Sequence, residues 1–123
     1  MAEILLVDDD DQFCETFGWV LREAAHSVTT AANGNEAICL VQDHAYDLVI
    51  IDLVMPEKEG VETIMELHRT NPALKIIAIS GGGLISAPEN YLGLARELGA
   101  TQTLAKPFSG KELLAAVAGV LSQ

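Results

Sequence analysis

Short apolar runs alternate along the chain with longer stretches in which apolar residues recur every three or four positions. The runs have the length and β-branched content of buried strands, whereas the longer stretches have the period of amphipathic helices. Alternation of this kind is typical of a parallel sheet whose strands are connected by helices. We predict strands at residues 3–7, 27–31, 46–52, 75–80 and 101–105.

Capping signals mark the starts of several predicted helices. An apolar stripe from Phe13 to Ala24 defines the first helix, and Asn33 is suited to cap the second. Capping-box sequences at Ser86–Glu89 and Ser109–Glu112 predict a fourth helix that begins near Ala87 and a fifth that follows the second box. Together with the strands, these signals predict five strand–helix units.

Right-handed connections place the helices on both faces of the sheet. The predicted fold is therefore a doubly wound, flavodoxin-like α/β sandwich of three layers, with a five-stranded parallel sheet in the order 2-1-3-4-5. That strand order is common among doubly wound domains of this size, and the hydrophobic pattern of the sequence does not determine it. Because the chain has 123 residues, half of them hydrophobic, we expect residues 1–123 to form a single domain.

The charge balance narrows the choice of partners. Seven Lys and Arg residues oppose eighteen Asp and Glu residues, which gives a formal net charge of −11. This charge works against direct binding to nucleic acid or to an anionic membrane surface, so proteins and cations are the expected partners. Cys14 and Cys39 lack metal-ligand spacing and are interpreted as buried or half-buried thiols. Without a signal peptide or a long apolar segment, a soluble cytoplasmic protein is expected.

Polar residues follow the predicted strands at one edge of the sheet. Asp8 and Asp9 come directly after the first strand, Asp52 ends the third, Ser80 ends the fourth and Lys106 follows the fifth. The carboxyl ends of parallel strands lie at the same edge, so these side chains should converge. Neighbouring carboxylates repel one another, and a divalent cation that prefers hard oxygen ligands would neutralise them.

Carboxylates, a hydroxyl and an ammonium group at one edge fit a phosphoryl-transfer site. Asp52 is the candidate nucleophile, which would become an aspartyl phosphate, and the Asp8–Asp9 pair is suited to hold Mg²⁺. Ser80 can donate a hydrogen bond to a phosphoryl oxygen, and Lys106 can neutralise another. The simpler interpretation, in which Asp8 and Asp9 only cap the first helix, applies to these two residues in isolation.

These residues carry a resemblance to a known family. The ordered set is Asp8-Asp9, Asp52 with Met55-Pro56 shortly after it, Ser80-Gly81 and Lys106-Pro107-Phe108. It resembles the receiver domain of two-component response regulators, and the match spans the whole chain. The family is known to have the strand order given above, so that order is taken over from it.

The resemblance implies a role for each residue. Asp52 would accept a phosphoryl group from a phosphohistidine on a sensor histidine kinase or a histidine phosphotransfer protein. Asp9 and Asp52 would ligate Mg²⁺ with the backbone carbonyl of Val54, and Asp8 would act mostly through a metal-bound water. Ser80 and Lys106 would be the switch hydroxyl and the phosphate-binding lysine, whereas Asp10 would have at most a supporting electrostatic role.

The output is also implied by the resemblance. A downstream protein target would recognise the phosphorylated state, whether the domain acts alone or was cut from a larger protein. Its only chemistry would be self-phosphorylation and self-dephosphorylation, so it would not be an enzyme. Trp19, which is predicted on an exposed flank of the first helix, would be either a kinase-docking residue or an ordinary surface aromatic.

The chain departs from the family pattern in two places. Thr103 stands three residues before Lys106, where the family usually has an aromatic switch residue. The stretch from Ser80 to Lys106 is about four residues longer than usual, and the excess is assigned to residues 81–85. We therefore hypothesise that activation works through ordering of this loop.

Two other classes of function are disfavoured. A Mg²⁺-dependent phosphatase with an aspartyl-phosphate intermediate would place an acid/base carboxylate two residues after its nucleophile, and this position is Val54. A flavin or nucleotide binder would carry a glycine-rich phosphate loop after the first strand, where this chain has aspartates.

Overall fold

The computed structural model describes residues 2–53, 60–80 and 99–123. Its five strands form one parallel sheet in the order β2-β1-β3-β4-β5, so the predicted fold class and strand order are confirmed. The strands are β1 (Glu3–Val7), β2 (Ser27–Ala31), β3 (Leu48–Asp52), β4 (Lys75–Ser80) and β5 (Gln102–Ala105). The described helices are α1 (Asp11–Glu23), α2 (Gly34–Asp43), α3 (Gly60–Thr70) and α5 (Gly110–Leu121).

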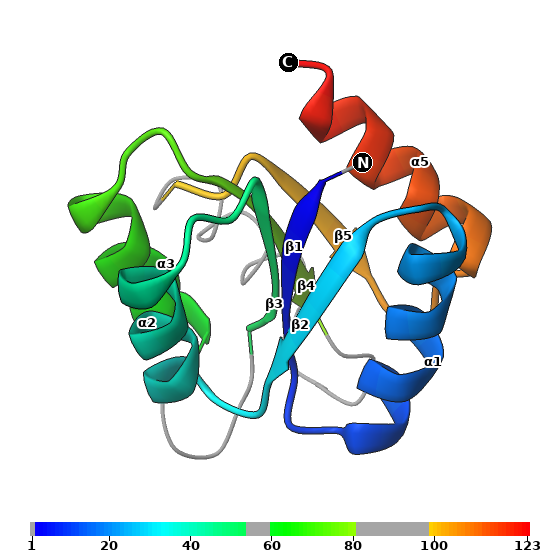
Figure 1. The fold of residues 1–123 in the computed structure, drawn as a ribbon, viewed down its shortest axis with the longest axis horizontal. Coiled ribbons are helices and arrows are strands. Elements are labelled where there is room, and N and C mark those ends of the chain that lie inside the picture. Colours follow the sequence, from blue (N-terminus) through cyan, green and yellow to red (C-terminus); the bar gives the residue numbers. More distant parts are fainter. Residues whose placement is uncertain (1, 54–59, 81–98) are drawn as a thin grey trace.

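The helices form two layers around the sheet (Figure 1). Helices α2 and α3 cover one face, and α1 and α5 cover the other. Strand β1 serves both layers, because Leu5 and Val7 belong to the core under α2 and α3, whereas Ile4 and Leu6 belong to the core under α1 and α5. The helix predicted to begin near Ala87 lies outside the described residues.

Two strands begin later than predicted, for the same physical reason. The prediction began the third strand at Tyr46, but β3 starts at Leu48, and the carboxylate of Asp47 accepts the N–H of Glu3 at 2.8 Å. The fifth strand was predicted from Thr101, whose hydroxyl accepts the N–H of Ile76 at 3.2 Å. In both cases a side-chain oxygen replaces the backbone carbonyl that would have extended the ladder.

The N-terminus of α1 is capped by Asp10. Its Oδ1 accepts the backbone N–H groups of Gln12 at 3.0 Å and Phe13 at 3.2 Å. The expectation that Asp10 has at most a supporting electrostatic role was therefore wrong, and so was the alternative in which Asp8 and Asp9 cap this helix. Because the third aspartate of the run supplies the cap, the first two remain available for the carboxyl edge of the sheet.

Capping of the other helices follows the sequence signals. Asn33 caps α2 through its side chain, and Ser109 with Glu112 forms the predicted capping box of α5. Helix α3 begins at Gly60, where a Cβ atom would overlap the backbone of Asp52 and Leu53. The start of α3 is thus pressed directly against the end of β3.

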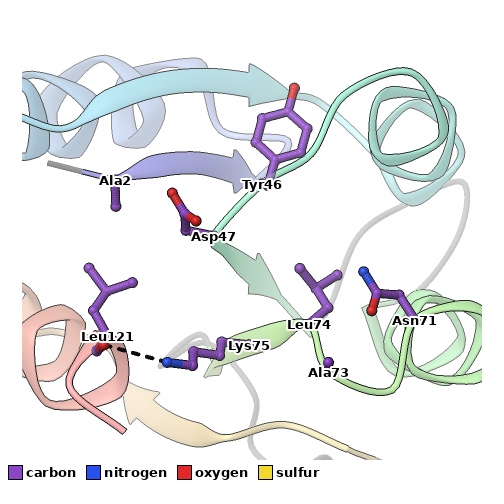
Figure 2. Close-up of a pocket in the computed structure, with 8 residues that line it drawn as sticks. All are labelled: Ala2, Tyr46, Asp47, Asn71, Ala73, Leu74, Lys75 and Leu121. Carbon is purple, nitrogen blue, oxygen red and sulfur yellow. Dashed lines mark hydrogen bonds between the residues drawn. The ribbon is translucent and has the colours of Figure 1, made fainter.

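The opposite edge of the sheet holds a hollow. Its volume is about 520 Å³, and it lies between the starts of β1, β3 and β4 and the end of α5 (Figure 2). Lys75 lines it and donates from Nζ to the carbonyl oxygen of Leu121 at 3.4 Å and to that of Gln123 at 2.8 Å. None of the residues predicted for phosphoryl transfer lines this hollow.

Candidate functional site

The candidate site is at the carboxyl edge of the sheet, where β1, β3, β4 and β5 end side by side. Asp8 follows β1, Asp52 is the last residue of β3, Ser80 is the last residue of β4, and Lys106 follows β5. This is the lower edge of the sheet in Figure 1. The convergence expected from the strand ends is therefore present in the structure.

Three carboxylates form a compact group at this edge. One oxygen each from Asp8, Asp9 and Asp52 lies within 4.8 Å of the others. Asp8 and Asp52 are buried, with 2% and 6% of their surface exposed, whereas Asp9 is exposed. Two shielded oxygens and one exposed oxygen fit a hard cation such as Mg²⁺, which keeps several water ligands. The predicted fourth ligand, the backbone carbonyl of Val54, lies outside the described residues.

Lys106 supplies the positive charge next to this group. Its Nζ lies 3.0 Å from Oδ2 of Asp8 and 3.5 Å from Oδ2 of Asp52. The same nitrogen lies 4.1 Å from the centroid of the Phe13 ring. With 22% of its side chain exposed, the ammonium group is shielded on most sides and compensates both buried carboxylates.

Burial and charge act in opposite directions on this pair. Burial raises the pKa of Asp8 above its ordinary value, although the N–H of Asp10 and the Lys106 ammonium oppose the shift. Burial alone would lower the pKa of Lys106, but Asp8 and Asp52 outweigh it and raise that pKa. The difference arises because the Asp8 side chain is almost fully buried and loses more hydration than the lysine. Lys106 is therefore held as an ammonium group.

Ser80 contributes a hydroxyl group with unused hydrogen-bonding capacity. Its Oγ is buried and has no hydrogen-bond partner among the described residues. The backbone of Ser80 itself is held to the next strand end, since Lys106 donates its N–H to the carbonyl oxygen of Ser80 at 2.9 Å. A buried hydroxyl without a hydrogen-bond partner lowers the stability of the folded state. A bound ligand that accepts a hydrogen bond from this hydroxyl would remove that cost.

Phe13 is a neighbour of the site that the sequence did not reveal. Its position in the apolar stripe predicted a core residue, and it does contact Phe17 and Phe108. The cap at Asp10, however, places Phe13 in the first turn of α1, and this turn lies at the carboxyl edge of the sheet. Recognition of Asp10 as the cap of α1 could have identified Phe13 as a neighbour of the site.

The cysteines and the tryptophan differ in how well they match expectation. Cys14 is half-buried, as predicted, but Cys39 is exposed on α2, so the expectation of burial was wrong there. Burial raises the pKa of Cys14 to about 11, with further contributions from Asp8, Asp11 and Asp10. Trp19 is 61% exposed on α1, as its place off the apolar stripe predicted.

Comparison with known proteins decides the family. The sequence model of the response regulator receiver domain matches residues 4–118. The chain belongs to the response-regulator receiver family. Its members are the phosphoacceptor domains of two-component regulators, and this role applies to the family in general.

Individual relatives agree with this assignment. The transcriptional regulatory protein CpxR of Klebsiella pneumoniae is 36% identical over 121 residues, which are 98% of this chain and 50% of CpxR. A putative response regulator from Chloroflexus aurantiacus superposes with a TM-score of 0.88 at 32% identity, covering 99% of this chain and 98% of the other. The chemotaxis response regulator CheY4 of Vibrio cholerae gives 0.87 at 30% identity and covers 98% of both chains.

The coverage differs between these relatives. The receiver chain described here spans about half the length of the curated relatives it matches, whereas it spans nearly all of the two solved structures. In the ranges that the structure describes, no helix of the receiver has the length and apolar character needed to cross a bilayer.

Proposed function

We propose that residues 1–123 form a single receiver domain that accepts a phosphoryl group on Asp52. The donor is a phosphohistidine on a sensor histidine kinase or a histidine phosphotransfer protein. The observation that carries this proposal is the convergence at one edge of the sheet of the three carboxylates, the Lys106 ammonium and the Ser80 hydroxyl, which has no hydrogen-bond partner in residues 2–53, 60–80 and 99–123.

Among the three carboxylates, Asp52 is the best candidate for the nucleophile. Asp8 holds the turn before α1 and the lysine, because Oδ1 accepts the N–H of Asp10 at 2.9 Å and Oδ2 accepts from Lys106 at 3.0 Å. Asp52 also contacts the lysine, with its Oδ2 3.5 Å from Nζ. Asp9 is exposed to water, which competes for its oxygens. Asp52 is shielded and belongs to the strand between those that carry Asp8 and Ser80, so a group bound to it is within reach of both neighbouring strand ends.

The proposed step is a direct phosphoryl transfer. A carboxylate oxygen of Asp52 forms a bond to phosphorus while the P–N bond of the phosphohistidine breaks, and the departing imidazole takes up a proton. The Ser80 hydroxyl donates a hydrogen bond to one phosphoryl oxygen, and the Lys106 ammonium neutralises another. Both groups are already shielded from water, so little reorganisation is needed.

Asp8, Asp9 and Asp52 are suited to hold Mg²⁺, and the backbone carbonyl of Val54 is the fourth ligand implied by the family. When bound, Mg²⁺ neutralises the carboxylates and the phosphoryl oxygens. Asp9 is the ligand most accessible to solvent, which suits capture of a hydrated ion. The raised pKa of Asp8 shows that its ionised form is costly here, and a bound cation would offset part of that cost.

The functional result is a change in protein binding. An aspartyl phosphate adds negative charge at the edge of the sheet, and the responses of Ser80 and Lys106 shift the population towards a binding-competent surface. The domain turns over no diffusible substrate, binds neither nucleic acid nor membrane directly, and acts in the cytoplasm. Its net charge of −11 is consistent with recognition by proteins.

Incubation with Mg²⁺ and acetyl phosphate or a phosphoramidate tests the proposal. We expect one stoichiometric, acid-stable and base-labile phosphoryl group on the peptide that contains Asp52. Asp52→Asn should abolish it, while the control Asp43→Asn, at an exposed residue near the end of α2, should leave it intact. Labelling of wild type at a residue other than Asp52, or full labelling of Asp52→Asn, would refute the assignment.

A further inference from the structure

The ammonium group of Lys106 is held on two chemically different sides. Carboxylates lie on one side, at 3.0 Å for Asp8 and 3.5 Å for Asp52. On another side, the face of the Phe13 ring lies with its centroid 4.1 Å from Nζ. This distance is measured to the charged nitrogen, so the charge itself, and not only the aliphatic stem, lies over the ring. A cation in this position is attracted by the ring quadrupole.

The ring of Phe13 is itself fixed by two others. Its centroid lies 4.7 Å from that of Phe17, the next turn of α1, and 6.0 Å from that of Phe108, which packs edge-on. Phe17 and Phe108 are also in contact, with centroids 5.1 Å apart. These are the three phenylalanines of the chain, and with Lys106 and Pro107 they line an apolar hollow of about 210 Å³.

The two kinds of contact constrain the lysine differently. A hydrogen bond to Asp8 fixes both the position of the ammonium and the direction of one N–H. Attraction to a ring face holds the charge near the ring but leaves the N–H directions free. A lysine that must exchange a carboxylate oxygen for a phosphoryl oxygen therefore benefits from a support that does not compete for its protons.

We propose that Phe13 is a positioning residue for Lys106, whose ring face supports the ammonium while it turns from Asp8 to a phosphoryl oxygen on Asp52. This inference rests on the proposed function. The Phe13 side chain has no polar or charged group that could act on phosphorus or on a metal, so its effect on the reaction passes through the lysine. The chemical class of the interaction is a cation–π contact in a site partly shielded from water.

Fluorination of the ring separates this role from simple packing. Replacement of Phe13 by 3,4,5-trifluorophenylalanine keeps the shape of the ring but removes most of its quadrupole. We expect the rate constant for phosphorylation by acetyl phosphate at saturating Mg²⁺ to fall about threefold to tenfold. The apparent Mg²⁺ affinity should stay within about twofold, because a phenylalanine ring carries no metal-ligand atom.

Phe17 provides the matched control, since it belongs to the same cluster but no cation–π contact is seen at its ring among the described residues. Trifluorophenylalanine at position 17 should leave the rate constant within about twofold of wild type. If fluorination at position 13 has no larger effect than at position 17, the ring only packs against its neighbours and the proposal is overturned. The proposal is also overturned if the rate constant falls in Phe13→Leu but not in the protein with trifluorophenylalanine at position 13.

A second measurement does not depend on phosphoryl transfer. The ε-methylene protons of Lys106 should show an upfield ring-current shift in the wild-type NMR spectrum, and Phe13→Leu should remove it. Absence of that shift in wild type would overturn the proposal by itself. If the shift is present but wild type takes up no phosphoryl group on Asp52, the proposed function fails and the switching role of Phe13 fails with it.

Discussion

Lys106→Met removes the ammonium group, which lies over the Phe13 ring, but keeps most of the apolar stem of the side chain. The change leaves Asp8 and Asp52, both nearly buried, without the cation that lies 3.0 and 3.5 Å from their oxygens. We expect the variant to be less stable than wild type without divalent metal. We also expect Mg²⁺ to reduce the difference, because the metal would compensate the same carboxylates.

The magnitude follows from the burial of the partners. Removing one member of a fully buried ion pair costs about 3–5 kcal/mol. The Lys106 side chain is 22% exposed, so water already screens part of the interaction, and we expect a loss of about 2–3 kcal/mol. For a domain of 123 residues this corresponds to a decrease in Tm of about 6–15 °C. The decrease should be at least halved at saturating Mg²⁺, because without the competing ammonium group the carboxylates of the variant should bind the metal more tightly, and mass action then stabilises the folded variant more than wild type.

Urea unfolding of both proteins in EDTA and in Mg²⁺ measures these free energies. Lys111→Met is the matched control, since Lys111 is an exposed residue in the first turn of α5 and should change stability by less than about 0.5 kcal/mol. Equal stability of Lys106→Met and wild type in EDTA would refute the view that the ammonium compensates these carboxylates. If the free energy of unfolding of Lys106→Met is lower than that of wild type by the same amount in EDTA and in Mg²⁺, the metal and the lysine do not compensate the same carboxylates.

Two further predictions concern the scaffold and the thiols. Gly60→Ala should destabilise the domain by about 2–4 kcal/mol in urea unfolding, because its Cβ would overlap the backbone of Asp52 and Leu53. Gly119→Ala in α5, where a Cβ would meet nothing within 4 Å, should instead stabilise it by about 0.5–1 kcal/mol; equal effects of the two changes would contradict this account. Iodoacetamide at pH 8 should modify Cys39 at least about tenfold faster than Cys14, whose pKa of about 11 leaves roughly 0.1% thiolate at that pH. Peptide mass spectrometry over pH 7–10 should show the Cys14 rate rising about tenfold per pH unit, and similar rates for both thiols at pH 8 would argue against the burial of Cys14.

The fold was predictable because its local signals agree with one another. The strand run of Ile4 to Val7 is buried on both faces, and the capping box at Ser109 and Glu112 forms where it was expected. The strand starts were less predictable, because Asp47 and Thr101 use side-chain oxygens where a strand would use its backbone carbonyl. A hydrophobic pattern contains no information about that substitution.

Most of the candidate site was predictable from the position of polar residues after buried strands. This rule identified Asp8, Asp52 and Lys106, which the structure brings together. It could not decide which of the four consecutive aspartates at positions 8–11 caps α1, since all four have the same side chain and differ only by one step in position. Without the cap at Asp10, the place of Phe13 beside the lysine was not visible either. The loop-ordering hypothesis for residues 81–85 concerns a segment outside the described residues, so it stays a prediction.

The number of residues in the segment from Asp8 to Phe13 is fixed by the groups that it places in the site. Within six residues it provides a buried carboxylate, an exposed carboxylate, the α1 cap and the ring under Lys106. The position of each group depends on the number of residues between it and the end of β1. Insertion or deletion of one residue there would misplace all the later groups together, whereas the same change in an exposed connection elsewhere would be absorbed locally.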